Sequence, residues 1–325
     1  MSRRNGAAGH LWLVGLLLFL PLFARADDYP SRPIHLIVTS PAGSLVDVIG
    51  RLVGEGLSAR LGQPVVVDNR PGAMSQLGTD VLVHADPDGY TLMIGPVELT
   101  LLPLLKKNYP YDPTRDITPV ALVTTSWTVF AIYPGLPVQT LPQFVDYAKA
   151  RPGKLRYGSG GVGGALHIAV EMLKLKTGID LIHVPYRGGE QAATDAMAEQ
   201  IEMVSMGLAS ARLAAGGKLR LLAQTGPRRH PLFPELPTTA EYGLSEVRMD
   251  TWFGLIAPPK TPDAIVARLD GAVADVEKEQ SFRDNLAKIG CTKAYLPHDE
   301  FSGYIAADLK KWQALIPAMG IAQIE

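Results

Sequence analysis

The sequence predicts an α/β protein of two lobes, each built on a mainly parallel sheet flanked by helices. Short apolar runs of strand length alternate with segments of helical periodicity, and Gly- or Pro-rich turns separate them. This alternation is typical of parallel strands whose two faces are both covered. The chain has 325 residues, and a chain of that length suggests about two domains.

The first part of the chain shows the alternation most clearly. Ile34–Val38 is a short apolar run, and the residues after Ser44 are apolar at helical spacing. A second helix is expected to end near His84, before an Asp-Pro-Asp-Gly turn, and Gly178 is expected to stop a later one. Strands are expected at Ile34–Val38, Val65–Val67, Thr91–Ile94, Lys154–Tyr157, Leu181–Val184, Ile201–Met206 and Leu219–Gln224. Further helices are expected at Leu141–Ala150, Leu166–Thr177, Asp263–Glu277, Ser281–Ile289 and Asp299–Leu315.

Two crossings between the lobes are expected, near Thr124–Ser126 and near Met249–Trp252. They divide the chain into a first lobe of residues 27–124 with 252–325, and a second lobe of residues 125–251. Ligands of open α/β sheets bind beyond the carboxyl ends of the strands, so the candidate site is expected in the loops that follow strands.

Residues 1–26 have the features of a secretory signal peptide. Arg3 and Arg4 precede the apolar run Leu11–Phe23, and Ala24-Arg25-Ala26 offers small residues before a cleavage point. The run has 13 residues, whereas a membrane-spanning helix needs roughly 20. Because Cys291 is the single cysteine of the chain, no intramolecular disulfide can form. An exported chain without disulfides favours the bacterial periplasm.

Composition and charge exclude several classes of protein. The chain is 47% hydrophobic and 19% charged, with a formal net charge of −1, so it offers no basic field for nucleic acid and no signature of disorder. The seven histidines lack metal-binding spacings such as HExxH, and no G-x-S-x-G elbow occurs. We therefore expect no metal, no cofactor and no catalytic residue.

The loop Ser40–Asp47 connects the first strand to a helix whose expected N-cap is Ser44. First-turn N–H groups lack intrahelical partners and carry the positive end of the helix dipole, which suits a carboxylate. Gly43 allows a ligand to approach the backbone. The alternative is a capping box of Ser44 and Asp47 that serves the helix alone, and both interpretations can hold together.

The segment Gly158–His167 also follows a strand and opens a helix. It contains a literal G-x-G-x-x-G pattern, but a dinucleotide site needs an acid at the end of the next strand, Leu181–Val184, and none stands there. Two interpretations of the segment are left: a loop that binds a small anion, or a tight turn. Ser159 is a candidate hydroxyl donor, and His167 is a candidate donor to a ligand or a packing residue.

Arg187 is the only cation among the three glycine-bearing loops. Arginine can hold a carboxylate with two parallel hydrogen bonds, which makes Arg187 a candidate ligand contact. A solvated surface arginine is the alternative interpretation.

Ordered matches along the chain carry a resemblance to a known family. They are Tyr29–Ile34, Pro41–Asp47, Leu61–Ala73, Pro87–Leu92, Tyr111–Pro113, Pro152–Leu155, His183–Gly188, Pro237-Thr238, Glu241 with Gly243, and Trp252–Leu255. On these stretches the chain resembles the Bug-type periplasmic solute receptors of tripartite tricarboxylate transporters, along essentially the whole length after the signal peptide.

The resemblance implies a periplasmic-binding-protein (Venus-flytrap) fold that closes on a small carboxylate-bearing or amino-acid-like solute. It implies a monomeric, non-enzymatic receptor of the periplasm that delivers its solute to membrane permease subunits. The ligand-binding residues it implies are Pro41, Ala42, Gly43, Ser44, Asp47, Met74 and Ser75 in the first lobe, and Ser159, Gly163, Gly164, His167, Arg187 and Gly188 in the second.

The chain departs from the family pattern at the implied site. The family usually has Pro-Pro-Gly-Gly where Pro41-Ala42-Gly43-Ser44 stands, Gly-Gly in place of Met74-Ser75, and commonly Ser in place of Gly164. These changes reshape the pocket, so a dicarboxylate, an amino acid, an aromatic acid and an uncharged solute all stay open.

Two alternative functions belong to other classes. A sensory receptor that signals to a two-component sensor kinase would use the same fold, and the receptor sequence does not separate the two. A secreted hydrolase would instead require Ser, His and an acid within hydrogen-bond reach in the cleft.

Overall fold

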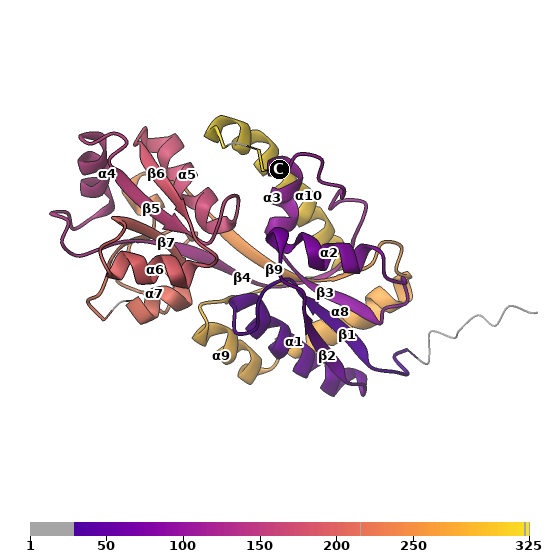
Figure 1. Cartoon of the computed structure of the whole chain (residues 1–325). Helices are drawn as coiled ribbons and strands as arrows, with labels where there is room; N and C mark the ends of the chain where they lie inside the picture. Colours follow the sequence, from indigo (N-terminus) through magenta and orange to yellow (C-terminus); the bar gives the residue numbers. More distant parts are fainter. Residues whose placement is uncertain (1–28, 215, 322, 325) are drawn as a thin grey trace, which may run out of the picture.

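A computed structural model describes residues 29–214, 216–321 and 323–324 of the chain. The expected signal peptide, residues 1–26, lies outside the described residues. The described chain forms two α/β lobes joined by two strands, β4 and β9 (Figure 1). No helix in the described ranges is long and apolar enough to cross a membrane.

The alternation of strands and helices predicted from the pattern is confirmed. The strands are β1 (Ile34–Val38), β2 (Val65–Asn69), β3 (Thr91–Pro96), β4 (Thr118–Ile132), β5 (Leu155–Ser159), β6 (Leu181–Pro185), β7 (Met203–Gly207), β8 (Arg220–Gln224), β9 (Asp250–Ala257) and β10 (Thr292–Leu296). The α-helices are α1 (Leu45–Leu61), α2 (Gln76–Val83), α3 (Glu98–Leu105), α4 (Leu141–Lys149), α5 (Ala165–Thr177), α6 (Gly189–Met197), α7 (Leu208–Ala214), α8 (Asp263–Glu277), α9 (Gln280–Lys288) and α10 (His298–Leu315). Short 3₁₀ segments are η2 (Ala73–Ser75), η3 (Ala240–Tyr242) and η4 (Ile316–Met319).

The strand order is β2-β1-β3-β9-β4-β7-β5-β6, with β10 and β8 also paired to β4. The parallel pairs are β1–β2, β1–β3, β5–β6 and β5–β7. The strands that join the lobes instead run antiparallel to their neighbours, which the sequence pattern did not reveal. The sheets are therefore parallel toward the outside of each lobe and antiparallel at the junction.

One strand, β4, belongs to both lobes. Its first part pairs with β9 as far as Trp127, which lies opposite Asp250, and its second part pairs with β7 from Thr128 onward. The change of partners thus lies close to the crossing expected near Thr124–Ser126. The lobe boundaries drawn from the sequence stay a prediction.

The core has three apolar clusters. In lobe 1, one cluster fills the face covered by α1 and α8 and includes Ile34 and Leu36. A second, which includes Ile37 and Phe130, continues from the opposite face of lobe 1 under α4 and α5 of lobe 2. The third lies beneath α6 and α7. Both lobes thus share one continuous apolar layer on one side of the sheet.

A buried polar contact fixes the position of α3 against this core. Asp308 of α10 accepts hydrogen bonds from Thr100 Oγ1 at 2.7 Å and from Trp252 Nε1 at 3.0 Å. The contact ties α3, α10 and β9 together, and all three groups are buried. It matters for the site because α3 begins at Glu98.

The last residue of α8, Glu277, is 2% exposed, and no group in the described part of the chain donates a hydrogen bond to its carboxylate. Burial raises the pKa of Glu277 from 4.5 to about 7, against the opposing charges of Lys293 and Arg283. The folded protein therefore holds a proton that the unfolded chain releases between these two values. The free energy of unfolding is therefore not reduced by Glu277 below about pH 4.5, and it decreases as the pH rises from there to about 7.

We expect Glu277→Gln to stabilise the fold at about pH 8 by up to roughly 3 kcal/mol and to change little at about pH 4. Urea denaturation at both pH values measures the difference. Glu55→Gln, at an exposed position of α1, is the control and should change stability little at either pH. A Glu277→Gln gain that is equal at both pH values would contradict the assignment.

Candidate functional site

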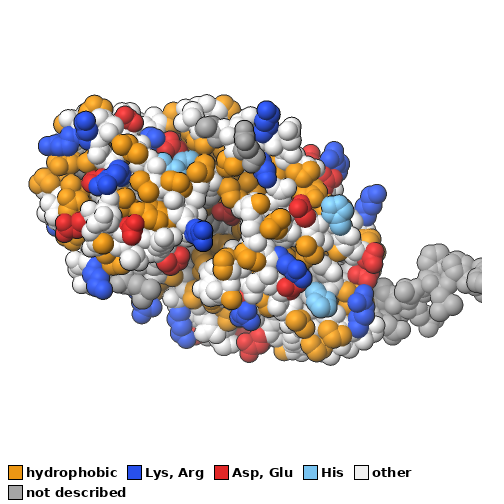
Figure 2. Space-filling view, in the orientation of Figure 1, with side chains coloured by type: hydrophobic (Ala, Val, Ile, Leu, Met, Phe, Trp, Pro, Cys, Tyr) orange, Lys and Arg blue, Asp and Glu red, His pale blue; other side chains and the backbone are white. Residues whose placement is uncertain are grey.

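A cavity of about 660 Å³ lies between the two lobes. Its walls come from the loops after β1 and β3 in lobe 1 and after β5, β6 and β7 in lobe 2, with β4 and β9 at the base. Figure 2 shows the hollow between the lobes, with both acidic and basic side chains around it. The carboxyl ends of strands from both lobes face it, as expected for an α/β binding site.

The first predicted loop lies in the cavity wall. Pro41, Gly43 and Ser44 line the cavity, whereas Ala42 does not. Ser44 is the N-cap of α1, as predicted, and its Oγ accepts the N–H of Asp47 at 3.3 Å. The first-turn N–H groups of α1 therefore open toward the cavity and are available to an anion.

Asp47 lies behind this loop instead of lining the cavity. Its carboxylate is 2% exposed and accepts the N–H of Gly43 at 2.8 Å, together with hydrogen bonds from Arg51 and Asn69. Burial alone would raise the pKa of Asp47, but these hydrogen bonds outweigh it and hold the pKa below the usual value. Asp47 thus positions the loop, and the structure does not bring it into the cavity wall, where the sequence placed it as a ligand contact.

The 3₁₀ segment η2 forms the mouth of the cavity. Met74 and Ser75 both line it, as expected from the sequence. Ala73, Met74 and Ser75 have φ values of 44°, 53° and 77°, a left-handed conformation that costs roughly 1–3 kcal/mol for each residue with a side chain. The strained backbone directs two side chains to the mouth where the family pattern places glycine.

The second predicted loop contributes residues 160–162 and 164–166 to the cavity wall. Gly164 lines the cavity and is the N-cap of α5. Gly163, with φ at +82°, does not line the cavity but faces lobe 1. A Cβ atom on Gly163 would lie 2.9 Å from Ile324 and 3.0 Å from both Leu105 and Met74. Gly163 is therefore a point where the lobes touch.

His167 lies behind the second loop. It is 4% exposed and stacks on His183 with ring centroids 4.1 Å apart. Its Nδ1 accepts the N–H of Gly163 at 3.0 Å, and burial lowers the pKa of His167 to about 3, so the ring is neutral at physiological pH. The contacts of His167 favour the packing interpretation, and the residue does not line the cavity.

Ser159 is fully buried and does not line the cavity. Its Oγ lies 2.7 Å from Nε2 of His183 and donates to the carbonyl of Gly161. Within the described ranges no acid is hydrogen-bonded to His183, so the Ser–His pair lacks both an open nucleophile and an orienting carboxylate. The arrangement that would favour a hydrolase is incomplete.

The third predicted loop places one cation at the cavity. Arg187 lines the cavity and is exposed. Gly188 is the N-cap of α6 and does not line the cavity, whereas Gly189 and Glu190 do. Glu190 is exposed and accepts a hydrogen bond from Ser210. This rim therefore carries one charge of each sign.

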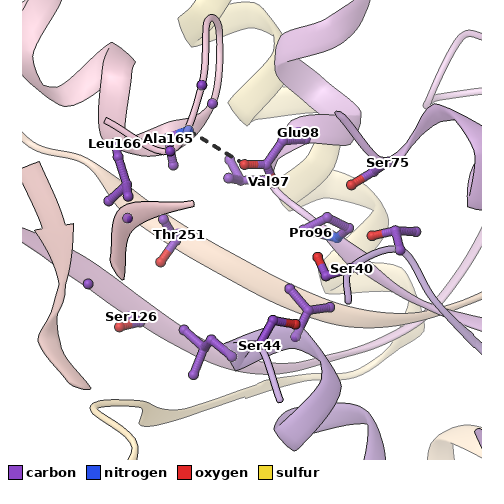
Figure 3. Close-up of a pocket in the computed structure, with 18 of the residues that line it drawn as sticks. Ser40, Ser44, Ser75, Pro96, Val97, Glu98, Ser126, Ala165, Leu166 and Thr251 are labelled. Atoms are coloured by element: carbon purple, nitrogen blue, oxygen red, sulfur yellow. Dashed lines mark hydrogen bonds between the residues drawn. The ribbon is translucent and has the colours of Figure 1, made fainter. Parts of the chain in front are cut away.

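Sequence reasoning missed the acid inside the cavity, Glu98. It is the first residue of α3, and its Oε1 lies 3.5 Å from the N–H of Ala165 in the other lobe (Figure 3). Burial raises the pKa of Glu98. The signal was available, because Glu98 follows the third parallel strand, and the rule that selected the other loops applies there too.

The base of the cavity was also missed. Ser126, Trp127 and Thr128 of β4 and Thr251 of β9 line it at the junction of the lobes. Figure 3 shows Ser126 and Thr251 on the two strands that run through the view. The sequence predicted that these segments connect the two lobes, but it did not predict that they line the cavity.

The described residues contain no group of three or more His, Cys, Asp or Glu side chains able to hold a metal ion. Hydroxyls, backbone N–H groups and a few charges converge on the cavity instead. This arrangement suits the binding of a small polar molecule.

We expect Asp47→Asn to lower the free energy of unfolding by about 1–3 kcal/mol, because the charge-assisted contacts to Gly43 and Arg51 are lost or weakened. The difference from the wild type should shrink as the pH falls below the usual aspartate range, since the low pKa of Asp47 contributes stability only while the group is ionised. Thermal denaturation against pH measures this. Asp68→Asn, at a half-exposed pair with Arg70, is the control, and an equal loss there would contradict the role of Asp47.

Comparison with known proteins identifies the family. The family model described as the tripartite tricarboxylate transporter family receptor matches residues 49–321. Protein BugT of Bordetella pertussis is 32% identical over 305 residues, covering 91% of this chain and 91% of that protein. A structure from R. palustris with adipate is 29% identical, with a TM-score of 0.83, and covers 91% of this chain and 100% of that one. MatC of Rhodopseudomonas palustris with bound malate is 26% identical, with a TM-score of 0.77, and covers 89% and 100%. The predicted family and two-lobed fold are confirmed: the chain belongs to the receptor family of tripartite tricarboxylate transporters, as a Bug-type solute-binding protein.

Proposed function

We propose that this protein captures a small carboxylate-bearing solute in the cleft between its lobes and delivers it to a membrane transporter of the tripartite tricarboxylate type. The observation that carries the proposal is the inter-lobe cavity, onto which the N-termini of α1 and α5 both open. A positive helix end that opens onto such a cavity suits the anionic group of a solute.

The dimensions of the cavity support a small molecule. Ligand pockets commonly measure roughly 300–1,000 Å³, and this one measures about 660 Å³. Structurally similar proteins were solved with adipate and with bound malate. We therefore extend carboxylate binding to this chain as a proposal.

The contacts between the lobes support a capture mechanism. Gly163 and Ala165 of lobe 2 meet Met74 and Glu98 of lobe 1 across the cleft. A solute that touches both walls stabilises this approach of the lobes, because it makes contacts that the separated lobes cannot make. The approached form is then the one that the permease subunits recognise.

We further propose that the receptor works as a monomer in the periplasm, exported by the signal peptide of residues 1–26, and that it binds its solute without chemical conversion. The incomplete Ser159–His183 pair supports binding over hydrolysis. A sensory role with a sensor kinase would use the same cleft, and reconstitution with the permease subunits distinguishes it from transport.

A thermal-shift screen over small carboxylates tests the binding proposal. A carboxylate that binds the native state should raise the Tm in proportion to the logarithm of its concentration. Ser44→Ala should reduce that shift, because the cap at the cavity is lost. Thr140→Ala removes the matching N-cap of α4, far from the cleft, and should lower stability by about 0.5–2 kcal/mol while leaving the ligand shift intact. Equal ligand shifts in both variants would argue against anion binding at α1.

We expect Gly163→Leu to lower solute affinity about tenfold or more, because the new side chain separates lobes that touch at this position. Gly178→Leu is the matched control, since Gly178 also has a positive φ, +73°, but a Cβ there has no neighbour within 4 Å. Both variants carry the same backbone strain, so their unfolding temperatures should fall similarly. Calorimetric titration with the best carboxylate of the screen measures the affinities, and equal affinities would show that Gly163 does not control approach of the lobes.

A further inference from the structure

We infer that Glu98 makes the cleft selective for solutes that carry a cationic nitrogen beside their carboxylate, such as amino-acid-like zwitterions, over dicarboxylates. The inference rests on the proposed function and names the class of solute. It starts from Glu98, the acid of the cavity wall whose carboxylate reaches from lobe 1 to the N–H of Ala165 in lobe 2.

The position of Glu98 is imposed by the packing of α3. The residues that follow it, Leu99, Leu101 and Leu102, are buried in the core, and Thr100 is tied to Asp308. The helix therefore cannot rotate Glu98 out of the cavity without exposing apolar surface.

The protein satisfies this carboxylate poorly. Its contact from another residue in the described chain is the N–H of Ala165 at 3.5 Å, longer than the usual range of about 2.7–3.2 Å for such a bond. Among the described residues no Lys, Arg or His forms an ion pair with it. A half-buried carboxylate without a cation is costly, and burial accordingly raises the pKa of Glu98. An ammonium group of a solute would supply the missing partner.

The other charged residues of the cavity wall also favour a solute with a cationic group over a dicarboxylate. Besides Glu98, the cavity is lined by Arg187 and Glu190, so acids outnumber cations. Asp47, behind the first loop, is already paired with Arg51. A dicarboxylate would bring two negative charges to this wall, whereas a zwitterion brings one charge of each sign.

The carboxylate of either solute has the same place available. Leu45 and Val46 line the cavity next to Ser44, and the N–H groups of this first turn have no partner within the helix. Because this end is common to both classes of solute, a comparison of matched solutes isolates the contribution of Glu98. The competing explanation is that Glu98 serves only to cap α5 and hold the lobes together.

The test is a calorimetric titration with matched unbranched probes of three to six carbons: dicarboxylates, ω-amino carboxylates and α-amino acids, with simple monocarboxylates as the reference series. The wild type should bind an amino carboxylate about tenfold or more tightly than the dicarboxylate of the same length. Glu98→Gln keeps the shape and the capping oxygen but removes the charge, so it should abolish or reverse that preference. Glu55→Gln removes an exposed acid of α1 that does not line the cavity, and it should keep the preference.

Two results would overturn the inference while leaving carboxylate capture intact. One is a wild type that prefers dicarboxylates at every chain length, which can be read without any variant. The other is a Glu98→Gln protein in which the wild-type preference persists, because the affinities of all series, the monocarboxylates included, stay the same or change by one common factor, as a capping role alone requires. If the wild type binds no probe, the monocarboxylates included, the proposed function fails and the inference with it.

Discussion

The site depends on the continuity of β4 across both lobes. The strand pairs with β9 up to Trp127 and with β7 from Thr128 onward. Its backbone hydrogen bonds therefore connect the two lobes through one continuous strand. Side chains secure each end: Ser126 donates to the carbonyl of Gly290 in lobe 1, and Trp127 donates to Gln224 in lobe 2. Because these residues also line the cavity, a movement of the lobes must bend the strand that forms the floor of the cleft.

The two lobes hold their loops by the same device. In each, a glycine before the N-cap donates its N–H to a buried side chain four residues later: Gly43 to Asp47, and Gly163 to His167. These two N–H groups already donate to protein side chains and are not available to a ligand. The first-turn N–H groups that follow are left for the solute. The rigidity of both loops thus comes from behind the wall, which keeps the cavity side of the helix ends open.

Much of this could be predicted from sequence because it is local. The Ser44 cap, the helix periods and the turn glycines are encoded within a few residues, and each lies where the pattern indicated. The roles of Asp47 and His167 could not be predicted, since they depend on partners such as Asn69 and His183, which only the tertiary fold brings near. The strand β9 and the helix α3 were missed because burial on nearly every side leaves no distinct period in the sequence, and β10 was missed because four of its five residues are half-buried.

The N-termini of α1 and α5 are not equivalent as binding sites for a carboxylate. At α5, the carboxylate of Glu98 already approaches the N–H of Ala165, so a solute carboxylate would have to displace an acid that packing holds in place. At α1, the nearest acid is Asp47, which faces away and is neutralised by Arg51. An incoming carboxylate therefore gains more at α1 than at α5, although both ends carry the same dipole. Lobe 1 therefore presents two opposite charges to the cleft. The N-terminus of α1 attracts a negative group, whereas the carboxylate of Glu98 on α3 repels one. A solute must be oriented so that each of its ends meets the matching site.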